Sequence, residues 1–146
     1  ETPENFTMVL FYRGHHCPVC KNYLQGLSAI LKDYEAAGFG VVAASMNDPD
    51  LAATSVSEWE IDNLRVAHSV TVEDAKRWGL WISQAFKEVE ADIFTVPGLF
   101  WVRPDGRLYL VDISNMPWAR PDLKNLLAKV EYALANDYPA RGTYQG

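Results

Sequence analysis

A strand, two cysteines and a helix follow one another near the start of the chain, and this junction limits the fold more than any other feature. Residues Phe6–Tyr12 (FTMVLFY) are an apolar run rich in β-branched and aromatic side chains, which is typical of a strand. After Pro18, leucines and a tyrosine recur at spacings of three and four, as on the buried face of a helix. The only two cysteines, Cys17 and Cys20, stand at the start of that helix. The pattern predicts a strand–turn–helix unit with a dithiol at the turn.

The rest of the chain predicts alternating strands and helices, then a hairpin and a last helix. We expect strands at Phe39–Met46 and Arg65–Val70, helices starting at Asp48-Pro49 and Thr71, a short helix and a loop over residues 80–95, two strands around the turn Pro104-Asp105-Gly106, and a helix over Pro121–Leu134. Four tryptophans are expected in the core: Trp59, Trp78, Trp81 and Trp101. Parallel first strands with an antiparallel hairpin predict an α/β sandwich with a central mixed sheet, in one domain over residues 1–146.

Charge and composition exclude several classes of function. The net charge is −6 and lysine and arginine form no block, so binding to nucleic acid or to an anionic membrane has no electrostatic support. No apolar run approaches the roughly 18 residues that a membrane span needs. A lone Cys-x-x-Cys favours the cytoplasm over an oxidising compartment. The chain begins at Glu1 without an initiator methionine, which leaves open an upstream segment.

The position of the cysteines suggests redox chemistry. Unpaired N–H groups and the positive end of the helix dipole stabilise a thiolate at a helix start. We therefore expect Cys17 to be the attacking thiolate and Cys20, one turn further, to be the resolving thiol. Arg13, His16 and Lys21 are candidates for lowering the pKa of Cys17, although the histidines could also be solvated turn residues.

A zinc half-site is the competing interpretation of the same residues. Cys17 and Cys20 would be joined by His15 or His16, but a structural zinc site takes four ligands and the chain has no second pair. We therefore expect no metal and no cofactor.

The motif Cys17-Pro18-Val19-Cys20, with Lys21 after it, resembles the redox motif of the thioredoxin fold. Thr95-Val96-Pro97, just before the predicted hairpin, resembles the segment that faces the dithiol in such proteins. The resemblance implies a cis bond before Pro97 and a Val96 backbone free to pair with an extended substrate. Trp118 and Arg120, in the segment NMPWARP, are weaker candidates, because a loop there could reach the dithiol.

The number of residues from the dithiol to Pro97 and the insertion between them resemble those of the peroxiredoxin-like AhpC/TSA branch. The sequence PGLFWVRPDGRLY resembles that branch as well. That branch often dimerises, so the resemblance implies a homodimer. Its peroxide site has a proline and a hydroxyl seven and three residues before the cysteine, where this chain has Leu10 and Gly14. The arginine of that site aligns with Pro97.

Three hypotheses follow. The first, favoured by the missing peroxide-binding groups, is a thiol–disulfide oxidoreductase that acts on a protein or small-molecule disulfide. The second is a peroxide reductase in which Cys17 becomes a sulfenic acid that Cys20 resolves. Either enzyme would need an external thiol reductant, such as a thioredoxin or glutathione system. The third is a binding domain with an idle Cys-x-x-Cys.

Overall fold

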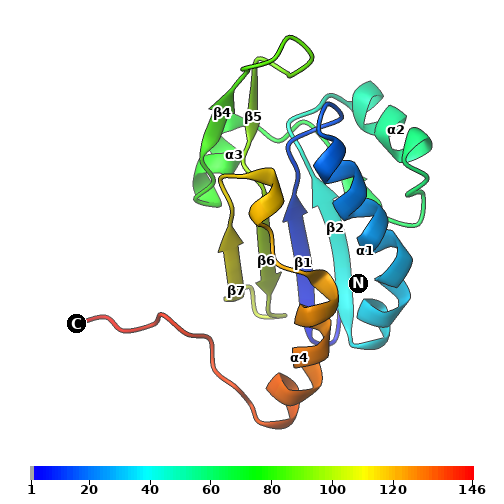
Figure 1. The fold of residues 1–146 in the computed structure, drawn as a ribbon. Coiled ribbons are helices and arrows are strands. Elements are labelled where there is room, and N and C mark those ends of the chain that lie inside the picture. The colour runs from blue at the N-terminus through cyan, green and yellow to red at the C-terminus, as the bar shows by residue number, and fades with distance from the viewer. Residues whose placement is uncertain (1) are drawn as a thin grey trace.

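The computed structural model describes residues 2–146, and its centre is a five-stranded sheet with helices on both faces (Figure 1). The elements are β1 (Phe6–Phe11), α1 (Pro18–Ala36), β2 (Phe39–Ala44), α2 (Pro49–Glu58), β3 (Arg65–Ala67), α3 (Val72–Arg77), β4 (Ile82–Gln84), β5 (Ile93–Thr95), β6 (Gly98–Val102), β7 (Leu108–Ile113), the 3₁₀ turn η1 (Pro117–Ala119) and α4 (Leu123–Ala135).

The strand order in the large sheet is β3-β2-β1-β6-β7. β1, β2 and β3 run parallel, because helices cross over between them. β6 and β7 are antiparallel and form the predicted hairpin. The predicted thioredoxin-like α/β sandwich with a mixed sheet is confirmed.

The central strand β1 is apolar along its whole length because both of its faces are covered. Met8 and Leu10 point into the core beneath α1 and α4, while Val9 and Phe11 point to the opposite face. There the ring of Phe11 contacts Trp78, just after α3, at a centroid distance of 5.4 Å. β1 thus ends at Phe11 with a packed core on each face of the sheet. The segment that carries the cysteines begins directly after this end.

The helix after the dithiol follows the predicted pattern. Its buried face includes Leu24, Leu27, Leu31 and Tyr34. Pro18 occupies the first helical turn, where its missing N–H removes no intrahelical hydrogen bond. None of the helices in residues 2–146 has the length and apolar character that crossing a membrane requires.

Residues 80–95 differ from the expected short helix and loop. They form the antiparallel pair β4–β5, in which Ile82 lies opposite Thr95. Strands of three residues are too short to show a period in sequence, and their stability comes from the cross-strand hydrogen bonds. Trp81, at the start of this hairpin, is 59% exposed, so its expected place in the core was wrong, whereas Trp59 and Trp101 are buried.

Candidate active site

Cys17 lies directly after the turn that follows β1 and caps α1. The turn is tight because Gly14 adopts a φ of +141° and its carbonyl accepts a hydrogen bond from the Cys17 N–H at 3.2 Å. The Cys17 Sγ accepts a hydrogen bond from the backbone N–H of Cys20 at 3.2 Å. A sulfur thus fills the N-cap position that a serine or aspartate oxygen usually takes. This geometry favours the thiolate form, because a charged acceptor binds an N–H donor more strongly.

Arg13 is the cation that contacts the sulfur of Cys17. Its Nη1 lies 3.6 Å from Cys17 Sγ, and its Nη2 forms an ion pair of 3.0 Å with Glu90. The guanidinium also lies over the ring of Phe94 at 4.9 Å. Both Glu90 and Phe94 belong to the β4–β5 hairpin, so that hairpin fixes the direction in which Arg13 points.

The environment separates the pKa values of the two cysteines. A hydrogen bond from the Cys20 thiol, followed by the Cys20 N–H and Arg13, outweighs burial and lowers the pKa of Cys17 to about 6. Burial, followed by the neighbouring Cys17, raises the pKa of Cys20 well above its usual range. At neutral pH the pair therefore holds one thiolate and one thiol, as expected for an attacking and a resolving cysteine.

His16 and Lys21, the other two candidates for lowering the pKa of Cys17, make different contacts. The His16 ring packs edge-on against Phe94 at 4.6 Å. Burial, followed by Arg13, lowers the pKa of His16, so the environment disfavours a positive charge on its ring. Lys21 donates its backbone N–H to the Cys17 carbonyl at 3.0 Å. In residues 2–146 its side chain makes no hydrogen bond or ion pair.

The side chain of His15 contacts α2 and the residue after it. Its ring stacks on Trp59 at a centroid distance of 5.8 Å, and its Nδ1 lies 2.9 Å from the Ser55 hydroxyl. Its backbone N–H donates to the side-chain oxygen of Asn47 at 2.8 Å. His15 thus ties the turn before Cys17 to α2 and to the segment after β2.

The segment before β6 does not have the expected conformation. Every peptide bond in residues 2–146 is trans, including the one before Pro97, so the expected cis bond was wrong. The Val96 N–H donates to the Trp81 carbonyl at 3.1 Å, and the Pro97 carbonyl accepts from the Ser114 N–H at 3.0 Å. The Val96 backbone was expected to be free, but its N–H group already makes a hydrogen bond, so this expectation was also wrong for the N–H. The Val96 N–H thus continues the pairing of β5 with the start of β4, and the Pro97 carbonyl that of β6 with the end of β7. The trans form is also the intrinsically favoured one.

Trp118 lies in η1 and Arg120 follows it, and the two side chains differ in exposure. Trp118 is 71% exposed. Arg120 turns inward, where its Nε donates to the Pro117 carbonyl at 2.8 Å and its guanidinium lies 4.3 Å from the centre of the Tyr23 ring on α1. Its positive charge is near enough to Cys20 to oppose the rise in that residue's pKa. The structure thus brings Arg120 beside Tyr23 on α1, where its charge acts on Cys20.

Sequence reasoning missed Glu90 and Phe94. Both lie in the segment expected to be a short helix and a loop. A single glutamate in the run KEVE carries no signal that it pairs with an arginine 77 residues earlier. Correct recognition of the β4–β5 pair would have been the only way to find them.

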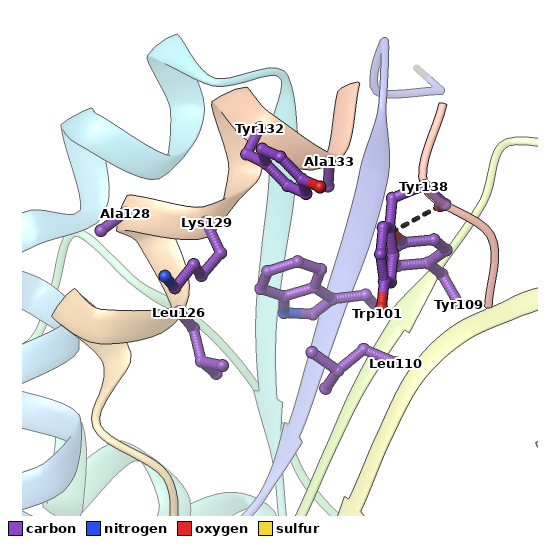
Figure 2. Close-up of a pocket in the computed structure, with 9 residues that line it drawn as sticks. All are labelled: Trp101, Tyr109, Leu110, Leu126, Ala128, Lys129, Tyr132, Ala133 and Tyr138. Atoms are coloured by element: carbon purple, nitrogen blue, oxygen red, sulfur yellow. Dashed lines mark hydrogen bonds between the residues drawn. The ribbon is translucent and has the colours of Figure 1, made fainter. Parts of the chain in front are cut away.

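A separate cavity of about 620 Å³ lies between α4 and the β6–β7 hairpin. Figure 2 shows the indole of Trp101 between the α4 side chains Leu126 and Lys129 on one side and Tyr109 on the other. The residues that line this cavity include neither cysteine nor either of the arginines that act on them. It is therefore not part of the dithiol site.

A thioredoxin-like fold that places two neighbouring cysteines at a helix start is the arrangement found in thiol-dependent oxidoreductases. The model of the AhpC/TSA family matches residues 2–111, and the chain belongs to this family, whose members are thiol-dependent oxidoreductases. A search of curated proteins found no match.

Several solved structures share the fold. The C45S mutant of peroxiredoxin 6 from Arenicola marina has a TM-score of 0.76 at 12% identity, covering 97% of this chain and 68% of that one. Reduced Prx3 from Vibrio vulnificus in complex with hydrogen peroxide has a TM-score of 0.71 at 12% identity, covering 86% and 81%. A peroxiredoxin-like protein from Aquifex aeolicus has a TM-score of 0.70 at 19% identity, covering 87% and 71%.

Proposed function

We propose that this chain is a thiol-dependent peroxide reductase that cycles between a Cys17–Cys20 dithiol and a disulfide. The observation that carries the proposal is the 3.6 Å contact between Arg13 Nη1 and Cys17 Sγ. Peroxide cleavage needs a fixed positive group beside the attacking sulfur, where charge develops on the oxygens. The resemblance places an arginine where this chain has Pro97, and Arg13 supplies such a cation from another position.

The cycle balances with these two residues and an external reductant. The Cys17 thiolate attacks one oxygen of ROOH, the O–O bond breaks, and the departing RO⁻ takes a proton to leave as ROH. The sulfenic acid on Cys17 then condenses with the Cys20 thiol, which forms the disulfide and releases water. An external dithiol reduces the disulfide and becomes oxidised itself.

Burial favours a small oxidant. Cys17 is 1% exposed and Cys20 is fully buried, so a peroxide reaches the sulfur more easily than the disulfide of a folded protein does. The Val96 N–H is already bonded to Trp81, which removes one of the backbone groups that a polypeptide substrate would use.

Disulfide exchange is the second candidate, and exposed apolar side chains near the dithiol favour it. Val19, between the two cysteines, is 37% exposed. Phe86 and Val89 are 92% and 74% exposed on the hairpin loop that Glu90 ties to Arg13. An apolar rim of this kind suits a protein partner, which could be the reductant or an oxidising substrate.

Stopped-flow oxidation of the reduced protein separates the two candidates. We expect one equivalent of hydrogen peroxide to remove both thiols at least about a hundredfold faster than it oxidises a simple thiol of the same pKa. Cys17→Ser should abolish the fast phase, whereas Cys20→Ser should keep it and leave a sulfenic acid that dimedone traps. Oxidation at the pace of a simple thiol, with fast reaction toward a disulfide, would assign the chain to disulfide exchange. An equally slow reaction with both oxidants would favour the third hypothesis, a binding domain whose cysteines are not catalytic.

A further inference from the structure

Arg120 is held rigidly on the inner side of α1. Its Nε is anchored by the Pro117 carbonyl at 2.8 Å, and its guanidinium stacks on Tyr23 at 4.3 Å. The Tyr23 hydroxyl in turn donates to the Pro121 carbonyl at 2.6 Å, which ties α1 to the residue after Arg120. The guanidinium therefore has little freedom to turn elsewhere.

The outer end of this guanidinium has no partner. Nη1 and Nη2 are both buried, and neither makes a hydrogen bond to any residue in 2–146. Unsatisfied buried donors on a charged group are costly, because the group loses its water and receives nothing in exchange. A negatively charged partner would satisfy both of these donors.

Cys20 is placed to be that partner. Cys20 and Tyr23 are three residues apart on α1, so they lie on the same face of the helix, and Arg120 lies over Tyr23. Arg120 is the side-chain cation that lowers the pKa of Cys20, against the larger effect of burial. The other titratable groups around Cys20 are Cys17 and, from the end of β1, Tyr12. Asp112 and Asp122 act on the neighbouring Tyr23 hydroxyl.

We propose that Arg120 is a positioning residue for the resolving step, in which its unpaired N–H groups stabilise the Cys20 thiolate while Cys20 attacks the sulfur of Cys17. This inference rests on the proposed function, because it needs Cys20 to resolve. Arg13 then serves the first attack and Arg120 the second. The contact is strongest when Cys20 is charged, so it accelerates resolution more than it stabilises the reduced protein.

The step can be followed with the aromatic disulfide 5,5′-dithiobis(2-nitrobenzoate). The Cys17 thiolate attacks one sulfur, and the first thionitrobenzoate leaves with the electron pair of the broken S–S bond. Cys20 then loses its proton to the buffer and attacks the Cys17 sulfur. The new Cys17–Cys20 bond expels the second thionitrobenzoate. The two releases are separate coloured phases, so one experiment measures both steps.

Arg120→Gln tests the inference. We expect the first release to stay within about twofold of the parent, the second to slow by about tenfold at pH 7, and its pH midpoint to rise by about one unit. Arg120→Lys should recover part of the second rate because it keeps the charge. Arg103→Gln is the matched control, since the Arg103 guanidinium also stacks on a tyrosine, Tyr109, at 4.6 Å. That control should change neither phase.

Failure of the role of Arg120 and failure of the Cys17–Cys20 cycle give different results. A second phase in Arg120→Gln with the parent rate and pH profile would overturn the role of Arg120. Equal slowing of both phases, unrelieved by lysine, would do the same, because it would show a merely structural effect. Release of only one thionitrobenzoate by the parent protein would instead overturn the Cys17–Cys20 cycle itself.

Discussion

Arg13 and Glu90, 77 residues apart in the sequence, form an ion pair of 3.0 Å that places the other arm of the guanidinium on the sulfur of Cys17. The second oxygen of Glu90 accepts the backbone N–H groups of Phe86 and Lys87 at 2.7 Å each. One carboxylate therefore holds both the hairpin loop and the Arg13 guanidinium in place. Arg13 links this loop to the thiolate.

Removal of Arg13 should raise the pKa of Cys17. We expect Arg13→Gln to move it upward from about 6 by roughly one unit, because one hydrogen bond and one positive charge beside the thiolate are lost. Titration of the thiolate absorbance of the reduced protein measures this. Arg107→Gln, at the exposed β6–β7 turn, is the control and should leave the titration unchanged. An Arg13→Gln titration that superimposes on that of the control would show that the contact has no electrostatic effect.

Loss of the Glu90 carboxylate should act through Arg13 and the hairpin. We expect Glu90→Gln to slow oxidation of Cys17 about three- to tenfold, because the guanidinium is then no longer held in place. Hydrogen exchange over residues 86–90 should become faster as well. Glu88→Gln is the matched control, an exposed glutamate in the same loop. If both variants react alike, the ion pair does not position Arg13.

The reduced protein should become more stable as pH rises from 6 to 8. The pKa of Cys17 is lowered from 9.0 to about 6, so its contribution to stability is complete above its unfolded pKa and is lost as pH falls through its folded pKa. Linkage gives a difference of about 2 kcal/mol in the free energy of unfolding between pH 6 and pH 8. Urea unfolding at several pH values measures it, and Cys17→Ala should lack this part of the slope. An unchanged slope in that variant would assign the pH dependence to other groups.

A side chain at position 14 should destabilise the turn before Cys17. Gly14 has a φ of +141°, and an added Cβ would lie 3.0 Å from the side-chain nitrogen of Asn47. We expect Gly14→Ala to lower the free energy of unfolding by about 1–3 kcal/mol. Gly26→Ala is the control, because Gly26 lies in α1 with no atom within 4 Å of the added Cβ, and it should stabilise by about 0.5–1 kcal/mol. Equal stability of the two variants would refute strain at Gly14.

The unit from Phe6 to Tyr34 could be predicted from the sequence by itself, because its signals are local. A continuous apolar run specifies a strand covered on both faces, and leucines at helical spacing specify the buried face of α1. The cysteine before Pro18 follows from the same reasoning, since a helix start is defined by its own few residues. The mixed sheet also follows, from the order of these segments.

Only the tertiary structure decided which groups surround the dithiol. Glu90 lies in a hairpin whose three-residue strands have no period, and Arg120 reaches α1 through an irregular turn. The Val96 N–H is occupied by the carbonyl of Trp81, and the Pro97 carbonyl by the N–H of Ser114, a residue of another segment. Such contacts join residues far apart in the chain, and their energy depends on distance and burial, which no local pattern records. The sequence determined where the two sulfurs stand, and the packing of distant segments determined which charges act on each.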